Sequence, residues 1–102
     1  MIQSREKVVK EEGASYFEGF IAQGGVLTLT NKRLIWKPNN LSKSEKFEIM
    51  LSEIGNVDYY KTLSIIPNGL SLFMKNGDIE NFVVDDRIDW RSSICKCLAA
   101  EL

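Results

Sequence analysis

The chain contains no histidine, which is the side chain that most often serves as a general base or a metal ligand near neutral pH. It also has no G-x-S-x-G motif, no P-loop and no nucleophile with a suitable base beside it in the sequence. Three aspartates, Asp85, Asp86 and Asp89, cluster where a helix is expected to begin, and carboxylates there stabilise the helix dipole. We therefore expect a protein that is not an enzyme and that needs no cofactor.

Cysteine is also scarce, with only Cys95 and Cys97 in the chain. The two residues are two positions apart in a predicted helix, where their side chains diverge by about 200° around the axis. They can neither form a disulfide with each other nor chelate one ion, and zinc needs about four ligands at suitable spacing. We expect no metal site, and we expect both cysteines to be small residues of the core or its flank.

Long hydrophobic runs are missing as well. No window approaches the roughly 18 consecutive apolar residues of a membrane-spanning helix, and residues 1–7 lack the apolar run of a secretory signal. The 102 residues are 44% hydrophobic and 26% charged, which is typical of one globular domain. The sequence therefore predicts a single domain over residues 1–102, located in the cytoplasm.

Positive charge is concentrated in one segment, although the net charge is only −1. Residues 32–46 carry five bases and one acid, whereas the remainder carries 8 bases and 13 acids. The five bases, which form our candidate anion- and lipid-binding site, are Lys32, Arg33, Lys37, Lys43 and Lys46. They could equally be ordinary solvated lysines of a loop. An acidic isoelectric point near 5.4 argues against nucleic acid as a partner.

Alternation of apolar and polar residues predicts strands in the first half of the chain. Residues 26–30 and 33–37 alternate around a short polar turn, which is typical of a half-buried β-hairpin. We expect a preceding strand over residues 15–22 with a bend at Gly19, and a turn over residues 23–25. Residues 1–12 are a charged lead-in segment that could form a short helix between Ser4 and Gly13 or could simply be extended.

The second half of the chain continues the pattern. Strands are predicted over residues 46–51, around residues 54–60, over residues 69–75 and over residues 78–84, with a loop from 61 to 68. Asn76-Gly77 is a strong hairpin signal. A two-residue loop there would place Ile79 and Val83 on the face of Leu70, whereas a three-residue loop would place Phe82 and Val84 there. The sequence leaves both alternatives open.

A helix is predicted over residues 86–101, following the aspartates. Its apolar stripe at 3.6-residue spacing comprises Ile88, Arg91, Ile94, Cys95, Leu98 and Leu102, with Trp90 and Cys97 on the flank. This stripe must pack against the sheet, and we expect Trp36 and Trp90 in the core. The predicted fold class is α+β, mainly β: a barrel of about seven antiparallel strands, within residues 15–84, capped by one C-terminal helix.

Four short segments resemble bacterial GRAM domains, a branch of the pleckstrin-homology-like (PH-like) superfamily. In chain order they are residues 16–20, 24–37, 49–54 and 86–90, and the corresponding segments of that family follow one another in the same order. The resemblance implies a strongly bent, seven-stranded sheet closed at one end by the helix, and a module that binds membranes, phosphoinositides or proteins. Phosphoinositide-binding members usually carry bases across the first two strands, whereas this chain has none from Gly13 through Asn31.

Apolar residues on predicted outer faces suggest a surface for a partner. The candidates are Met50, Tyr60 and Phe73, extended by Ile65 and Ile66 of an apolar loop that could instead fold over the open barrel end. The groove between a sheet edge and the final helix offers a further route, by strand addition of a peptide. We therefore expect a non-enzymatic interaction module that binds a protein partner or itself. The alternative is a weak binder of anionic membrane lipid through residues 32–46, peripheral at the inner membrane face.

Overall fold

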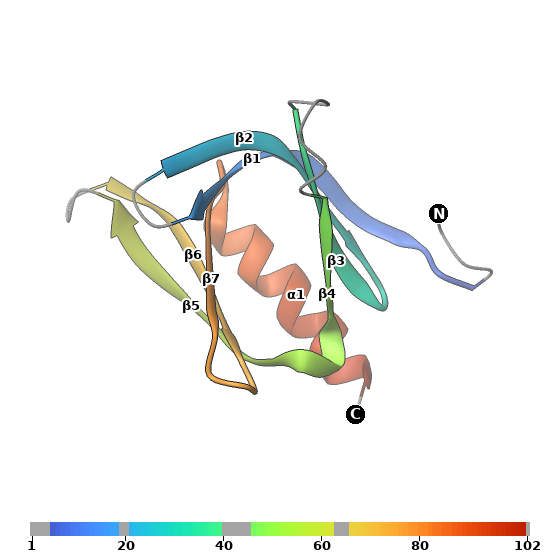
Figure 1. The fold of residues 1–102 in the computed structure, drawn as a ribbon. Helices are drawn as coiled ribbons and strands as arrows, with labels where there is room; N and C mark the ends of the chain where they lie inside the picture. The colour runs from blue at the N-terminus through green and yellow to red at the C-terminus, as the bar shows by residue number, and fades with distance from the viewer. Residues whose placement is uncertain (1–4, 19–20, 40–45, 63–65, 102) are drawn as a thin grey trace.

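The computed structural model describes residues 5–18, 21–39, 46–62 and 66–101, which form one strongly bent antiparallel sheet and a C-terminal helix (Figure 1). This arrangement confirms the predicted fold class. The elements in chain order are β1 (Val8–Glu18), β2 (Ile21–Thr30), β3 (Arg33–Pro38), β4 (Phe47–Met50), the 3₁₀ turn η1 (Leu51–Glu53), β5 (Ile54–Thr62), β6 (Ile66–Met74), β7 (Ile79–Val83) and α1 (Arg87–Glu101).

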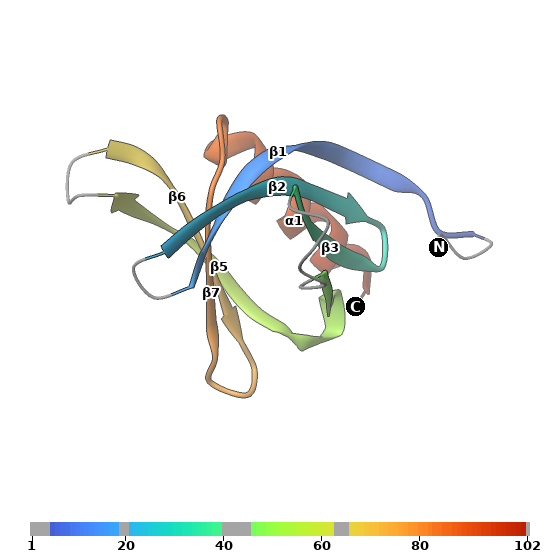
Figure 2. The same ribbon diagram turned by 45° about the horizontal axis from the view of Figure 1, so that its top comes forward.

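The strand order across the sheet is β4-β3-β2-β1-β7-β6-β5, so β1 lies in the middle and β4 and β5 are the edges. β1 pairs with β2 along most of its length and with β7 through Ser15, Tyr16 and Phe17. Figures 1 and 2 show that the bend brings β5–β7 opposite β3 and β4, with α1 crossing the space between them. The helix therefore closes one end of the barrel, as the apolar stripe required.

The predicted boundaries of the first two strands are wrong. β1 begins at Val8, inside the expected lead-in, and residues 23–25 belong to β2 rather than to a turn. Gly25 is needed because the chain is crowded there: a Cβ would lie 2.6 Å from the ring of Trp36 and even closer to the carbonyl oxygen of Lys37. Close approach of another strand requires glycine as strongly as a turn does. The predicted bend at Gly19 lies outside the described residues.

The hairpin between β6 and β7 has the longer of the two loops considered. Met74 and Asp78 flank a three-residue loop, the amide of Met74 donates to the carbonyl of Asp78 at 2.8 Å, and Gly77 has a φ of +98°. Leu70 therefore lies opposite Phe82, which is buried, whereas Ile79 is 52% exposed. The predicted loop over residues 61–68 is shorter than expected, because β5 extends to Thr62 and β6 begins at Ile66.

The core lies between the inner face of the sheet and α1, and it contains both tryptophans as predicted. Its aromatic centre is formed by Tyr16, Trp36, Phe47 and Phe82, and neighbouring rings in this group have centroids 5.0 to 5.9 Å apart. The buried side of α1 differs from the prediction: it comprises Trp90, Ile94 and Cys97, while Ile88 is 67% exposed. The helix is rotated so that its largest apolar side chain, Trp90, points into the barrel.

Candidate functional site

Arg33 of the basic segment is paired with two carboxylates of the chain itself. Its register on β3 places it on the same face as Lys37, as expected, but its Nε donates to Oε2 of Glu6 at 2.8 Å and its Nη1 pairs with Glu48. The hydrogen bond with Glu6 raises the pKa of Arg33 above its ordinary value. Glu6 itself has a fully buried side chain that also accepts from the hydroxyl of Thr30 at 2.6 Å. The two carboxylates already balance the charge of Arg33, so its contribution to an anion site stays an untested prediction that these contacts disfavour.

Two of the remaining bases come together on the outer face of the sheet. Lys37 and Lys46 are exposed and line a hollow of about 380 Å³ whose lining also includes Val26 and Ile35. Glu11 lies in the same lining, so the hollow is not purely cationic. Lys32 is half-buried at the turn between β2 and β3, and Lys43 lies outside the described residues. The structure therefore brings together two of the five predicted bases.

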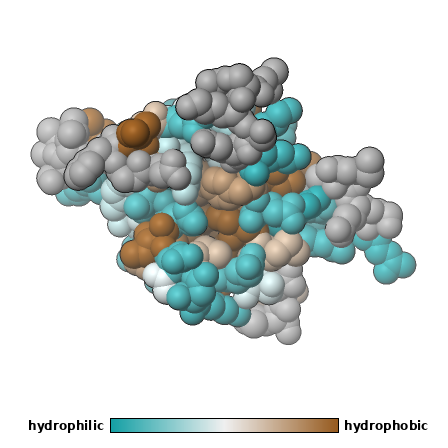
Figure 3. Space-filling model, viewed as in Figure 1, coloured by the Kyte–Doolittle hydropathy of each residue, from teal (hydrophilic) through white to brown (hydrophobic). Residues whose placement is uncertain are grey.

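The predicted partner residues do not form one patch. Phe73 is 38% exposed and lies opposite Ile79 on the outer face of β6 and β7, whereas Met50 lies on β4 opposite Arg33. Ile66 is exposed at the start of β6, and Ile65 lies outside the described residues. On the face seen in Figure 3, hydrophobic residues gather in separate areas with hydrophilic residues between them.

Tyr60 differs from its prediction as an exposed partner residue. It is half-buried, and its ring packs over Gly69, where an added Cβ would lie 2.5 Å from a ring carbon. Its hydroxyl is buried and has no hydrogen-bond partner among the described residues. Burial raises the pKa of Tyr60 above its ordinary 10.0. Tyr60 on β5 lies opposite Gly69 on β6, and Gly69 is four residues from Phe73. Tyr60 and Phe73 are therefore about 13 Å apart in the direction of the strands.

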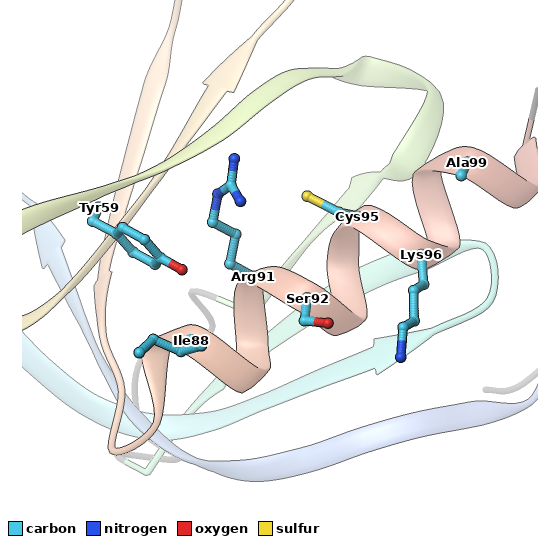
Figure 4. A pocket seen from close by; sticks show the side chains of 7 residues that line it. All are labelled: Tyr59, Ile88, Arg91, Ser92, Cys95, Lys96 and Ala99. Atoms are coloured by element: carbon cyan, nitrogen blue, oxygen red, sulfur yellow. The ribbon is translucent and has the colours of Figure 1, made fainter.

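A groove between α1 and β5 was only partly anticipated by the sequence, which indicated a route between a sheet edge and the helix. Figure 4 shows Tyr59 extending from β5 towards α1, and Arg91 extending from α1 towards β5. The guanidinium carbons of Arg87 and Arg91 lie 4.6 and 5.5 Å from the centroid of the Tyr59 ring. The sequence signal that could have found this site is Arg91 itself, a charged residue within an otherwise apolar stripe.

The part of the chain that the structure describes contains neither a metal-binding cluster nor a membrane-spanning helix. Within it, no cluster of three or more His, Cys, Asp or Glu side chains is arranged to hold a metal ion. Within the same residues, no helix has the length and apolar character that crossing a membrane requires.

Comparison with known proteins identifies the fold and the family. The solved N-terminal PH domain of Vps36 superimposes with a TM-score of 0.81 at 18% identity, covering 99% of this chain and 85% of that one. The solved N-terminal PH domain of the human ARAP2 protein gives 0.74 at 17% identity, covering 90% and 80%. The C-terminal domain of an unknown protein from Leishmania infantum gives 0.76 at 17% identity, covering 93% and 85%.

These identities are low, so the three structures show a shared PH-like fold. No curated protein matched the sequence. The family model of the GRAM domain, however, matches residues 1–97, which is nearly the whole chain. This chain therefore belongs to the GRAM domain family.

Proposed function

We propose that this protein is a non-enzymatic interaction module that binds a protein partner or a second copy of itself. GRAM and PH-like domains are interaction modules that bind lipids or proteins. The observation that carries the protein-binding function is the cross-strand pair of Phe73 and Ile79, two large apolar side chains exposed by 38% and 52% on the outer face of the sheet. Covering such a pair removes apolar surface from water, which is the main favourable contribution to protein association.

The proposal is supported by the state of the basic segment. Arg33, its one guanidinium, is neutralised by Glu6 and Glu48. The segment thus offers an anionic surface fewer free cations than its composition suggests. The apolar surfaces of Phe73 and Ile79, by contrast, remain exposed to solvent.

The proposal is tested by sedimentation velocity over a range of protein concentrations, together with cross-linking and capture from extracts of the source cells. Ile79→Ser should weaken the association about tenfold or more if this residue is central to the interface. Ile21→Ser is the matched control, because Ile21 is 74% exposed at the start of β2. Equal behaviour of the two variants, or a wild-type protein that stays monomeric and captures nothing, would count against the proposal.

A second function, weak binding of anionic membrane lipid at the inner membrane face, is favoured by the hollow that Lys37 and Lys46 line. A lysine close to an anionic membrane surface contributes about 1 kcal/mol, so two give weak and salt-sensitive adsorption. Co-sedimentation with phosphatidylcholine vesicles of graded phosphatidylserine content measures it. The double variant Lys37→Glu/Lys46→Glu should abolish the binding, whereas Lys7→Glu, a change at an exposed lysine before β1, should have a smaller effect.

A further inference from the structure

We infer that the groove between α1 and β5 binds a short acidic segment of a protein partner, one that carries an aliphatic side chain beside its carboxylates. The inference rests on the proposed function, because it names the chemistry of a protein partner. It concerns a different surface from the Phe73–Ile79 pair, so the two can be tested separately.

The polar groups at this edge of β5 are already engaged, which disfavours strand addition. Nε of Arg91 donates to the carbonyl of Val57 at 2.9 Å, and Nη1 of Arg87 donates to the carbonyl of Tyr60 at 3.1 Å. The amide of Tyr59, between them, donates to Oδ1 of Asp58 at 2.8 Å. An incoming strand would have to displace these side chains, whereas a ligand that contacts the side chains themselves would not.

The two guanidiniums are held in place for a carboxylate. Each guanidinium has five N–H donors, and one hydrogen bond to β5 together with the cation–π contact with Tyr59 restrains it while leaving other donors available. Because the arginines are ordered before binding, little side-chain entropy is lost when a carboxylate forms its two parallel hydrogen bonds. No carboxylate within the described residues forms an ion pair with either arginine.

The charges of the groove are all of one sign. Arg91 and Lys96 contribute to its lining, Arg87 lies beside it, and no acidic residue belongs to that lining. The whole chain has a net charge of −1, so this cationic groove contrasts with the rest of the molecule. Figure 4 shows Lys96 pointing away from Arg91, which makes it a charge at the rim of the groove.

Apolar surface in the groove indicates a second requirement of the ligand. Ile88 is 67% exposed on the first turn of α1, and Tyr59 is 38% exposed opposite it on β5. The hollow that they line with the helix has a volume of about 450 Å³, which is enough for a few side chains of a peptide. An aliphatic side chain between Ile88 and Tyr59 would cover both.

Neighbouring acids favour a peptide over a membrane. Asp58 follows Val57 on the edge strand, and Asp85, Asp86 and Asp89 surround the start of α1, all of them exposed. A flat anionic membrane facing the groove would also face these carboxylates and be repelled. A narrow peptide covers a smaller area, so it can place one or two carboxylates at Arg87 and Arg91 while facing fewer of these acids.

The test uses a set of fluorescein-labelled peptides that combine leucine with glutamate at varied spacings, and a matched set with glutamine in place of each glutamate. Fluorescence anisotropy should show members of the acidic set binding at least about tenfold more tightly than their glutamine counterparts, because charged hydrogen bonds are lost in the latter. Bound peptide should also slow alkylation of Cys95, which lines the groove and is half-buried.

Two variants locate the binding. Arg91→Gln should weaken it about tenfold while retaining a donor for Val57. Because that change could disturb β5, Ile88→Asp provides a second variant at a largely exposed position, and it should weaken binding by repelling the acidic ligand. Lys7→Gln is the control. It removes a positive charge from the segment before β1, which does not line the groove, and it should leave the affinity unchanged.

The inference is overturned if no acidic peptide binds, if the acidic and glutamine sets bind equally, or if Ile88→Asp binds as the wild type does. It is also overturned if only phosphatidylserine vesicles bind and Arg91→Gln abolishes that binding, since the groove would then be a lipid site. Self-association that depends on Ile79, together with no binding of any acidic peptide, would leave the proposed function standing and remove this inference alone.

Discussion

The indole nitrogen of Trp90 donates a hydrogen bond to Oε1 of Glu12 at 3.2 Å and so joins the first turn of α1 to β1. The ring is completely buried, and the ammonium of Lys10 lies 5.1 Å from its centroid. Lys10 in turn pairs with Asp89 at 2.6 Å and with Glu12 at 3.3 Å. A single aromatic residue thus fills the core and has its one polar atom satisfied, which is how buried tryptophan is usually accommodated.

We expect Trp90→Ala to lower the free energy of unfolding by about 3–5 kcal/mol, because a buried aromatic ring is replaced by a cavity. Urea denaturation followed by far-ultraviolet circular dichroism measures the change. Ile88→Ala, two residues earlier and largely exposed, should alter it by no more than about 0.5 kcal/mol. Similar losses for both variants would contradict the assignment of Trp90 as the helix anchor.

Replacement of the Tyr60 hydroxyl should behave differently from replacement of the Tyr16 hydroxyl. Tyr60→Phe removes a buried oxygen without a partner among the described residues, so we expect stability to stay the same or to rise by up to about 1 kcal/mol. Tyr16→Phe removes a hydrogen bond to Glu80 at 2.6 Å and should lower stability by about 1 kcal/mol. Urea midpoints of the two variants measure this difference. Equal losses of stability would contradict the prediction and indicate that the Tyr60 hydroxyl has a hydrogen-bond partner in solution.

Alkaline pH should destabilise the fold. Burial raises the pKa of Tyr60 above 10.0, and the hydrogen bond with Asp89 raises the pKa of Lys10 above 10.5. In both cases the folded state holds the proton more tightly than the unfolded state, so this stabilisation is complete below the unfolded pKa and is lost as pH rises through the folded one. Urea midpoints measured in a pH series should therefore fall above about pH 10. Tyr60→Phe should show a shallower fall.

The pair of Glu6 and Arg33 should be intolerant of single replacements. Arg33→Met leaves the fully buried carboxylate of Glu6 without its cation, which is more costly than removing both charges. We expect a lower thermal midpoint than for Lys37→Met, an exposed position on the same strand. The double variant Glu6→Gln/Arg33→Met should recover part of the loss. Additive effects of the two changes would show that the residues are not coupled.

Local patterns predicted much of the fold. The alternation over residues 26–30 and 33–37, the Asn76-Gly77 turn and the aspartates before α1 each depend on neighbouring residues, and the structure places a strand, a turn and a helix start there. The three-residue loop at Asn76-Gly77 was one of two alternatives, because the choice depends on which face of β7 packs inward.

The features that the sequence did not predict depend on distant residues. Gly25 was interpreted as part of a turn, but it is required by Trp36 on the neighbouring strand. Arg33 was interpreted as free, but Glu6, 27 positions earlier, lies over it. The contact of Arg87 with Tyr59 also needs the helix to fold back along the edge of the sheet. Such pairings are set by the closed shape of the barrel and have no local signature.

The pairing of β1 with β7 has a consequence for synthesis of the chain. The partners of Ser15, Tyr16 and Phe17 on β7 are Val83, Phe82 and Asn81, which are synthesised 64 to 68 residues later. At about 5–20 residues per second, β1 keeps one edge without its partner strand for about 3–14 s on the ribosome. β2 to β4 can meanwhile form hairpins from local contacts, because each of these strands pairs with its neighbour in sequence. The nascent chain therefore exposes an unpaired strand edge until β7 has been made, and this is the interval in which chaperone binding or aggregation would compete with folding.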